Sequence, residues 1–83
     1  MSAEDEVKDV ANTISELDTD TTVPRNVKEK LRKVSEILNK NEELKSRVNK
    51  ALNEMDEIAD DMNIQPYTRT QIWNIVSILE KYA

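Results

Sequence analysis

The carboxylates between positions 54 and 61 come closest, by type and spacing, to a chemical site. Glu54, Glu57 and Asp61 are spaced i, i+3 and i+7, so on a helix they share one face. Asp56 and Asp60 form a second column beside them. Hard cations such as Mg²⁺ need several converging oxygen ligands, which these carboxylates could supply. Acidic helix faces are more often solvated and paired with lysine, so we expect no metal site and no cofactor.

Three residue types that most catalysis depends on are missing. The chain has 83 residues with no histidine, no cysteine and no glycine. It therefore lacks a neutral-pH imidazole base, a thiolate nucleophile and a soft metal ligand. It also lacks the glycine-rich turns that hold nucleotide phosphates. We expect no catalytic residues and a protein that is not an enzyme.

The second candidate site is a basic stripe. Arg25, Lys28 and Arg32 align along one side of a helix, and phosphate binding needs only such a stripe. No aromatic residues are interleaved to stack bases, and the formal net charge of the chain is -5. Pairing with acidic helices is the favoured reading, and nucleic acid is a possible partner that we do not favour.

Two arginines occupy positions that a helix disfavours. Arg25 and Arg69 each lie in the first turn after a proline, where a cation opposes the helix dipole. Such a position calls for a compensating partner, and Glu57 or Asp61 is the expected one. An interhelical ion pair among these four residues is favoured over an anion site shared by two helix N-termini.

Apolar residues recur at helical spacing in four segments separated by short polar stretches. The four predicted helices are Ser2 to Leu17, Pro24 to Leu38, Asn39 to Met62, and Tyr67 to Tyr82. Connections this short make each helix antiparallel to the previous one. The pattern predicts an all-α, compact up-and-down four-helix bundle formed by a single domain, residues 1–83. A HEAT-like pair of hairpins, suggested by prolines 42 residues apart, is the alternative.

Particular residues are expected to set the helix ends. Ser2 is the expected N-cap of the first helix, and Asn39 with Glu42 has the spacing of a capping box. Asn63 is expected to end the third helix in the left-handed conformation. Met55 and Met62 fall on the apolar stripe of that helix and are expected in the core.

The last helix is apolar over more than half of its circumference. A core stripe is flanked on opposite sides by two further large residues, Trp73 and Ile78. Such a helix is either central to the bundle or has surface left for a partner. The candidate interface comprises Trp73, Ile72, Ile75, Val76, Ile78 and Leu79.

Charge and hydropathy point to a soluble, cytoplasmic protein with no membrane contact. The first residues after Met1 are acidic and polar, the reverse of a signal peptide. No apolar run approaches the ~20 residues of a membrane span. The absence of cysteine fits a reducing compartment.

Two strings resemble the signatures of a small archaeal family, uncharacterised protein family 0147. They are Thr22 to Asn26 and Arg69 to Ser77, and the segment Met55 to Ile58, with Asp61 and Asn63, resembles the acidic stretch between them. The resemblance covers Thr22 to Leu79 and implies a four-helix bundle with bromodomain-like topology. It implies no activity, because the family has none assigned and a fold does not specify a function.

Two functional hypotheses follow. The first is a non-enzymatic protein-interaction module that associates with itself, as a homo-oligomer, or with a protein partner through the fourth helix. The alternative is an RNA- or ribosome-associated factor that uses the basic second helix.

Overall fold

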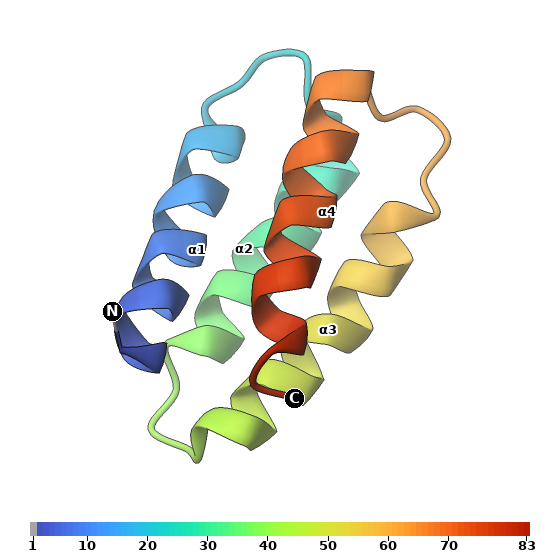
Figure 1. The fold of residues 1–83 in the computed structure, drawn as a ribbon. Helices are drawn as coiled ribbons and strands as arrows, with labels where there is room; N and C mark the ends of the chain where they lie inside the picture. The colour runs from blue at the N-terminus through green and yellow to red at the C-terminus, as the bar shows by residue number, and fades with distance from the viewer. Residues whose placement is uncertain (1) are drawn as a thin grey trace.

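The computed structural model describes residues 2–83, which form four α-helices and no strands. The helices are α1 (Ala3–Asp18), α2 (Arg25–Leu38), α3 (Leu44–Ala59) and α4 (Pro66–Glu80). Successive helices run antiparallel, and α4 returns to pack against α1 (Figure 1). The principal packing partners are therefore neighbours around a ring, which confirms the all-α bundle. Stacked HEAT-like hairpins would place α1 along α3 and α2 along α4, so that alternative is wrong.

The helix starts follow the local residue chemistry. The Ser2 hydroxyl accepts a hydrogen bond from the Asp5 backbone N–H at 3.2 Å, and the Asp5 carboxylate accepts from the Ser2 N–H at 3.5 Å. This reciprocal capping box confirms Ser2 as the N-cap of α1. Pro24 immediately precedes α2 and Pro66 opens α4, where a missing N–H costs no helical bond.

The predicted capping box at Asn39 does not form. Asn39 instead ends α2, its backbone N–H bonding to the carbonyls of Ser35 and Glu36. Helix α3 begins at Leu44, five residues later than expected. Residues 39–43 carry no apolar side chain that a helix could bury, so they form the turn and α3 begins with its apolar stripe.

Helix α3 also ends earlier than expected, at Ala59. Met62 lies beyond it with 92% of its surface exposed, so the prediction that it is a core residue is wrong. The chain turns because the Asp61 side chain accepts the Asn63 backbone N–H at 2.8 Å, forming a local turn. Asn63 is not left-handed, since no non-glycine residue within residues 2–83 has a positive φ.

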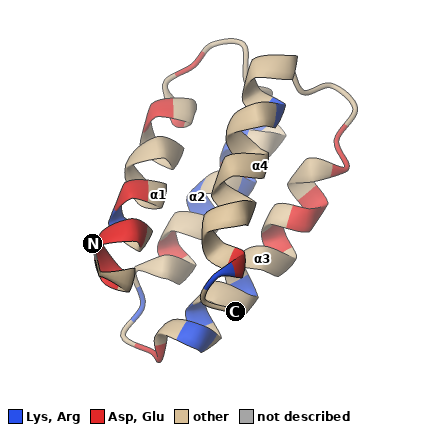
Figure 2. Ribbon diagram, viewed as in Figure 1, with Lys and Arg blue, Asp and Glu red and all other residues tan. Residues whose placement is uncertain are grey.

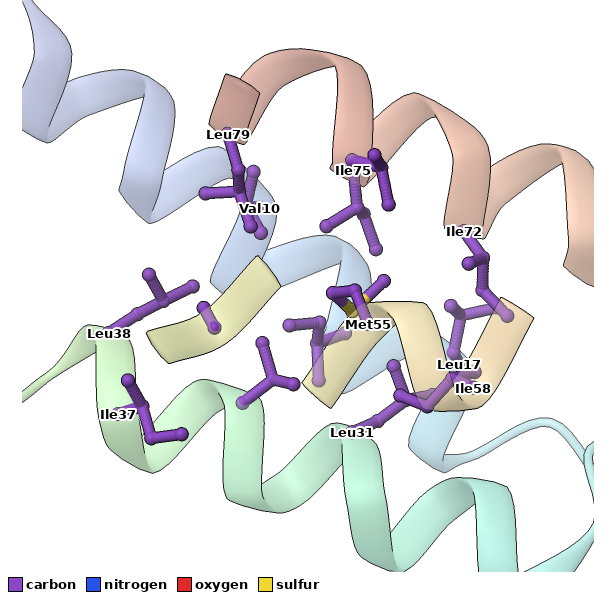
Figure 3. Close-up of a cluster of buried hydrophobic side chains, with 14 of the residues drawn as sticks. Val10, Leu17, Leu31, Ile37, Leu38, Met55, Ile58, Ile72, Ile75 and Leu79 are labelled. Carbon is purple, nitrogen blue, oxygen red and sulfur yellow. The ribbon is translucent and has the colours of Figure 1, made fainter. Parts of the chain in front are cut away.

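One apolar core runs between the helices. Side chains from all four helices meet there (Figure 3), and Met55 lies at its centre, fully buried as expected. Val23 and Ile64, from the two connections at the upper end of Figure 1, are buried as well. The buried helical residues are Val7, Val10, Ile14, Leu17, Val27, Leu31, Val34, Ile37, Leu38, Val48, Ala51, Met55, Ile58, Ile72, Ile75, Val76 and Leu79. Every predicted helix thus contributes residues of its apolar stripe to this core.

Candidate functional site

The bundle buries most of the predicted α4 interface. Four of its six residues lie within the core at 0–4% exposure, where a partner cannot reach them in the folded protein. They are Ile72, Ile75, Val76 and Leu79. Ile78 is half-buried against the core, whereas Trp73 keeps 50% of its surface exposed. The candidate interface is thereby narrowed to Trp73 and whatever surrounds it on the surface.

Around Trp73 lies an uncharged surface, the α4 face, which comprises Tyr67, Thr70, Trp73, Asn74 and Ser77, all exposed. These residues project away from the buried stripe because each position on a helix advances by 100°. Figure 2 shows α4 without charge along most of its length, unlike the other three helices. Tyr67 is 65% exposed, and Trp73 is the eighth of the fifteen residues of α4. A large aromatic side chain therefore stands midway along α4, at the edge of an uncharged face.

Arg69, the one basic residue of α4, contacts the end of α3 rather than this face. Its guanidinium donates to the backbone carbonyls of Ala59 and Asp61, both at 2.9 Å. The compensating partner expected for Arg69 therefore exists, but it is the open carbonyl end of α3 rather than a carboxylate. A cation suits this end because the last carbonyls of a helix lack intrahelical donors and carry the negative end of the dipole.

The other members of the predicted ion pair are engaged elsewhere. Glu57 pairs with Lys30 at 3.8 Å. The Asp61 carboxylate accepts from the Asn63 backbone N–H and from the Asn26 amide, bonds that lower its pKa below the ordinary value. Arg25 forms no ion pair with any carboxylate of residues 2–83. The four residues thus share one end of the bundle without forming the predicted contact.

Arg47, which no sequence motif indicated, connects three helices at the opposite end of the bundle. Only 8% of its surface is exposed. Its guanidinium donates to the carbonyl of Leu38 at 2.8 Å, to that of Glu42 at 3.0 Å and to the Glu4 carboxylate at 2.7 Å. One side chain therefore joins the start of α1, the end of α2 and the start of α3.

Arg47 and Arg69 occupy equivalent positions and make the same kind of contact. Each is the fourth residue of its helix, and each donates to the carbonyl of the last residue of the preceding helix. Both arginines also fall on an apolar stripe, three residues from Leu44 and from Ile72 respectively. A charged residue at such a position is the signal that could have identified them, because it must find partners beside the core.

Pairing with the acidic helices was expected for Arg25, Lys28 and Arg32, but of these three only Arg32 forms an ion pair within residues 2–83. Arg32 forms a two-bond pair with Asp18 of α1, at 2.9 and 3.4 Å. Lys33 pairs with Glu54 of α3 at 3.2 Å. Two carboxylates of the acidic face of α3, Glu54 and Glu57, thus pair with lysines of α2. Within residues 2–83 no group of three or more acidic side chains could hold a metal ion.

The three residues of the predicted nucleic-acid stripe line a common hollow. This α2 hollow is an open depression of about 450 Å³ lined by Val23, Arg25, Lys28, Glu29 and Arg32. It lies along the first two turns of α2, where Figure 2 shows basic residues behind α4. The structure therefore brings Arg25, Lys28 and Arg32 together, as the stripe predicted.

The C-terminal end of α4 is tied to α1. The Tyr82 hydroxyl donates to the Glu6 carboxylate at 2.5 Å, and Lys81 lies 3.8 Å from the same group. The hydrogen bond to Glu6 raises the pKa of Tyr82 above its ordinary value. Tyr82 was expected only as the end of the helix, and this contact closes the ring of helices.

Thr68, in the first turn of α4, has a buried hydroxyl whose energetic cost can be tested. It is 1% exposed, and its hydroxyl has no hydrogen-bond partner among residues 2–83. Thr68→Val removes that unpaired group and will raise the free energy of unfolding by about 1 kcal/mol. The thermal midpoint of a domain this size will rise by about 4–8 °C, measured by circular dichroism.

The matched control for Thr68 is Thr70→Val. Thr70 is exposed, and its hydroxyl donates to the Pro66 carbonyl at 3.1 Å. Its replacement will change the midpoint little. A clear destabilisation by Thr68→Val would show that the buried hydroxyl has a partner and would refute this prediction.

Comparison with known proteins places the chain among uncharacterised archaeal proteins. A model of an uncharacterised protein family (UPF0147) matches residues 1–82. A UPF0147 protein of Methanocaldococcus jannaschii is 44% identical over 79 residues, covering 94% of this chain and 85% of its own. One of Archaeoglobus fulgidus is 32% identical over 77 residues, covering 93% and 88%. The resemblance noted from Thr22 to Leu79 is confirmed and extends over α1.

A solved structure shares the fold. A crystal structure of a protein of unknown function superposes with a TM-score of 0.89 at 40% sequence identity, covering 95% of this chain and 91% of the other. The names of these relatives assign no activity. None of the helices in residues 2–83 has the length and apolarity needed to cross a bilayer.

Proposed function

The chain belongs to the uncharacterised protein family (UPF0147), and we propose that it is a non-enzymatic helical module that pairs with a second copy of itself through the α4 face. The observation that carries the proposal is the half-exposed Trp73, midway along α4 in an uncharged helix face. Among all residues 35% are charged, so an uncharged face of three turns stands out from the rest of the surface. The lack of histidine and cysteine supports a role without catalysis.

A second copy suits this face because the face can be its own complement. In a twofold pairing the same patch is used on both sides, so the axis passes through the centre of the patch. A twofold axis between Trp73 and Asn74, with the two copies of α4 antiparallel, places Trp73 beside the partner's Asn74, and Thr70 beside the partner's Ser77. The short side chains of Thr70 and Ser77 let the helix axes approach, and Trp73 fills the centre, where interface hot spots concentrate.

The size of the face sets the strength of the pairing. Fifteen helical residues extend about 22 Å, so one helix face buries far less than the ~800 Å² per partner of a stable complex. We therefore expect a weak dimer that forms at micromolar to millimolar concentrations. Each copy also has a formal net charge of -5, and the resulting repulsion is screened by salt. Association will consequently strengthen as the ionic strength rises.

The test is a concentration series by sedimentation velocity. The wild-type protein will shift towards the dimer as its concentration rises, and Trp73→Asp will weaken association roughly tenfold or more, because it removes the central aromatic contact and places a carboxylate from each copy near the axis. Asn49→Asp is the matched control, since it adds the same charge at an exposed position of α3. Trp73 is half-exposed, so both variants will keep wild-type helicity.

Two outcomes would contradict the proposal. One is a wild-type protein that stays monomeric up to millimolar concentration at high salt. The other is a dimer that Trp73→Asp and Asn49→Asp weaken equally, because the decrease would then follow net charge rather than the α4 face.

A further inference from the structure

We propose that the α2 hollow is a binding site for a phosphate group. Its volume of about 450 Å³ lies within the range of small-molecule sites, and three of its five lining residues are cationic. The proposal concerns a surface separate from the α4 face and does not depend on the dimer.

Two of the three cations in the hollow form no ion pair within the bundle. Arg25 and Lys28 form no ion pair with a carboxylate of residues 2–83, whereas Lys30 and Lys33 pair with Glu57 and Glu54. Structural pairing thus accounts for the cations that face α3 and for Arg32, which pairs with Asp18, but not for Arg25 and Lys28. Free cations kept together in an acidic chain favour an external anion.

Lys28 departs from the pattern set by the two buried arginines. It is the fourth residue of α2, the position that Arg47 occupies in α3 and Arg69 in α4. Those arginines donate to the end of the preceding helix, whereas Lys28 lines the hollow. Its charge also helps to lower the pKa of nearby Asp20, although that shift arises first from hydrogen bonds with Thr22. At this one connection the cation remains available to a ligand.

The lining indicates what part of a ligand is recognised. No aromatic ring lines the hollow, and Val23 is its one apolar residue, so there is no platform on which a base could stack. Arg25 and Lys28 can donate charge-assisted hydrogen bonds to phosphate oxygens, and Arg32 can add to them while it pairs with Asp18. Glu29 opposes an anion, so binding is expected to be weak. Phosphate on a small molecule and phosphate in a nucleic-acid strand share this chemistry.

The experiment titrates two probes, inorganic pyrophosphate and a ten-nucleotide oligouridylate, while amide shifts are followed by NMR. Arg25→Gln and Lys28→Gln will each raise the dissociation constant about tenfold, as expected for losing one charge-assisted hydrogen bond. Lys45→Gln is the matched control, because Lys45 is exposed on α3 at the other end of the bundle. Glu29→Gln will tighten binding. All four residues are exposed or half-buried, so the variants will fold.

The outcomes distinguish a small phosphate ligand from a nucleic-acid strand, and they also show whether the hollow binds phosphate at all. Saturable binding of pyrophosphate that weakens in Arg25→Gln and Lys28→Gln supports a site for a small phosphate ligand. Binding of the oligonucleotide alone, lost in the same variants and weakened by salt, supports a strand as the source. The proposal is overturned if neither probe binds at millimolar concentration, or if Lys45→Gln weakens binding as much as the hollow variants do. Salt will weaken this binding and strengthen the dimer, so each proposal can fail without the other.

Discussion

Replacing Arg47 with methionine will lower the free energy of unfolding by about 3 kcal/mol. The change removes the guanidinium that donates hydrogen bonds to the Leu38 and Glu42 carbonyls. A hydrogen bond from a charged group to such an acceptor contributes about 1.5–3 kcal/mol. Methionine keeps the apolar stem, so packing loss adds little. A domain of this size has only about 4–12 kcal/mol of stability in total. Urea denaturation followed by circular dichroism will measure the loss.

Two further variants separate the carbonyl bonds of Arg47 from its ion pair. Glu4→Gln removes only the pair with a carboxylate that is 60% exposed, and will cost less than about 1 kcal/mol. Arg47→Lys keeps the charge but lacks the planar guanidinium that reaches both carbonyls. Its loss of free energy of unfolding will therefore be intermediate. If Glu4→Gln costs as much as Arg47→Met, the ion pair rather than the carbonyl bonds stabilises this end.

Arg69→Met will lower the free energy of unfolding by about 2 kcal/mol, less than Arg47→Met because Arg69 is only half-buried. The matched control is Arg25→Met. Arg25 also lies in the first turn of a helix after a proline, but forms no ion pair within residues 2–83, so its replacement will leave stability nearly unchanged. The same urea titration compares the two variants.

The double variant of Arg47 and Arg69 tests whether the two ends act independently. The arginines lie at opposite ends of a bundle 32 Å long and share no partner. Their effects will therefore add within about 0.5 kcal/mol.

An equal loss of stability in Arg25→Met and Arg69→Met would contradict the prediction for Arg69. It would show that the bonds to the α3 carbonyls are not what distinguishes Arg69 from Arg25.

Much of the fold could be predicted because it depends on periodicity. The stripes of α1, α2 and α4 predicted their buried residues, and short polar connections predicted antiparallel neighbours. Periodicity also aligned Arg25, Lys28 and Arg32, which the structure places in one hollow. These features follow from the 3.6-residue repeat alone.

The contacts that secure the helix ends could not be predicted in this way. Arg47 reaches the Leu38 carbonyl only because residues 39–43 form a turn, and the capping spacing of Asn39 and Glu42 pointed to a helix there instead. The Asp61 carboxylate accepts a hydrogen bond from the Asn63 backbone N–H just after the end of α3. Such side-chain bonds compete with continuation of the helix, which the apolar stripe up to Met62 had predicted. Side-chain bonds to backbone depend on turn geometry, which residue spacing does not encode.

The candidate interface was predicted too broadly for a related reason. A wide apolar arc on α4 fits both a central helix and a docking helix, and only packing decides between them. The bundle buries Ile72, Ile75 and Leu79 and leaves Trp73 half-exposed. The part of the arc that remains for a partner is therefore one aromatic side chain within an uncharged surface.

The most direct measurement on the central proposal is a filtered NMR experiment on a mixture of isotope-labelled and unlabelled protein at millimolar concentration. It detects proximity only between two copies of the chain. Antiparallel pairing through the α4 face predicts contacts from the Trp73 indole to Asn74 of the partner subunit, and from Thr70 to Ser77 of the partner subunit. Intermolecular contacts confined to α1, α2 or α3, or none in a sample that sedimentation shows to be dimeric, would contradict it.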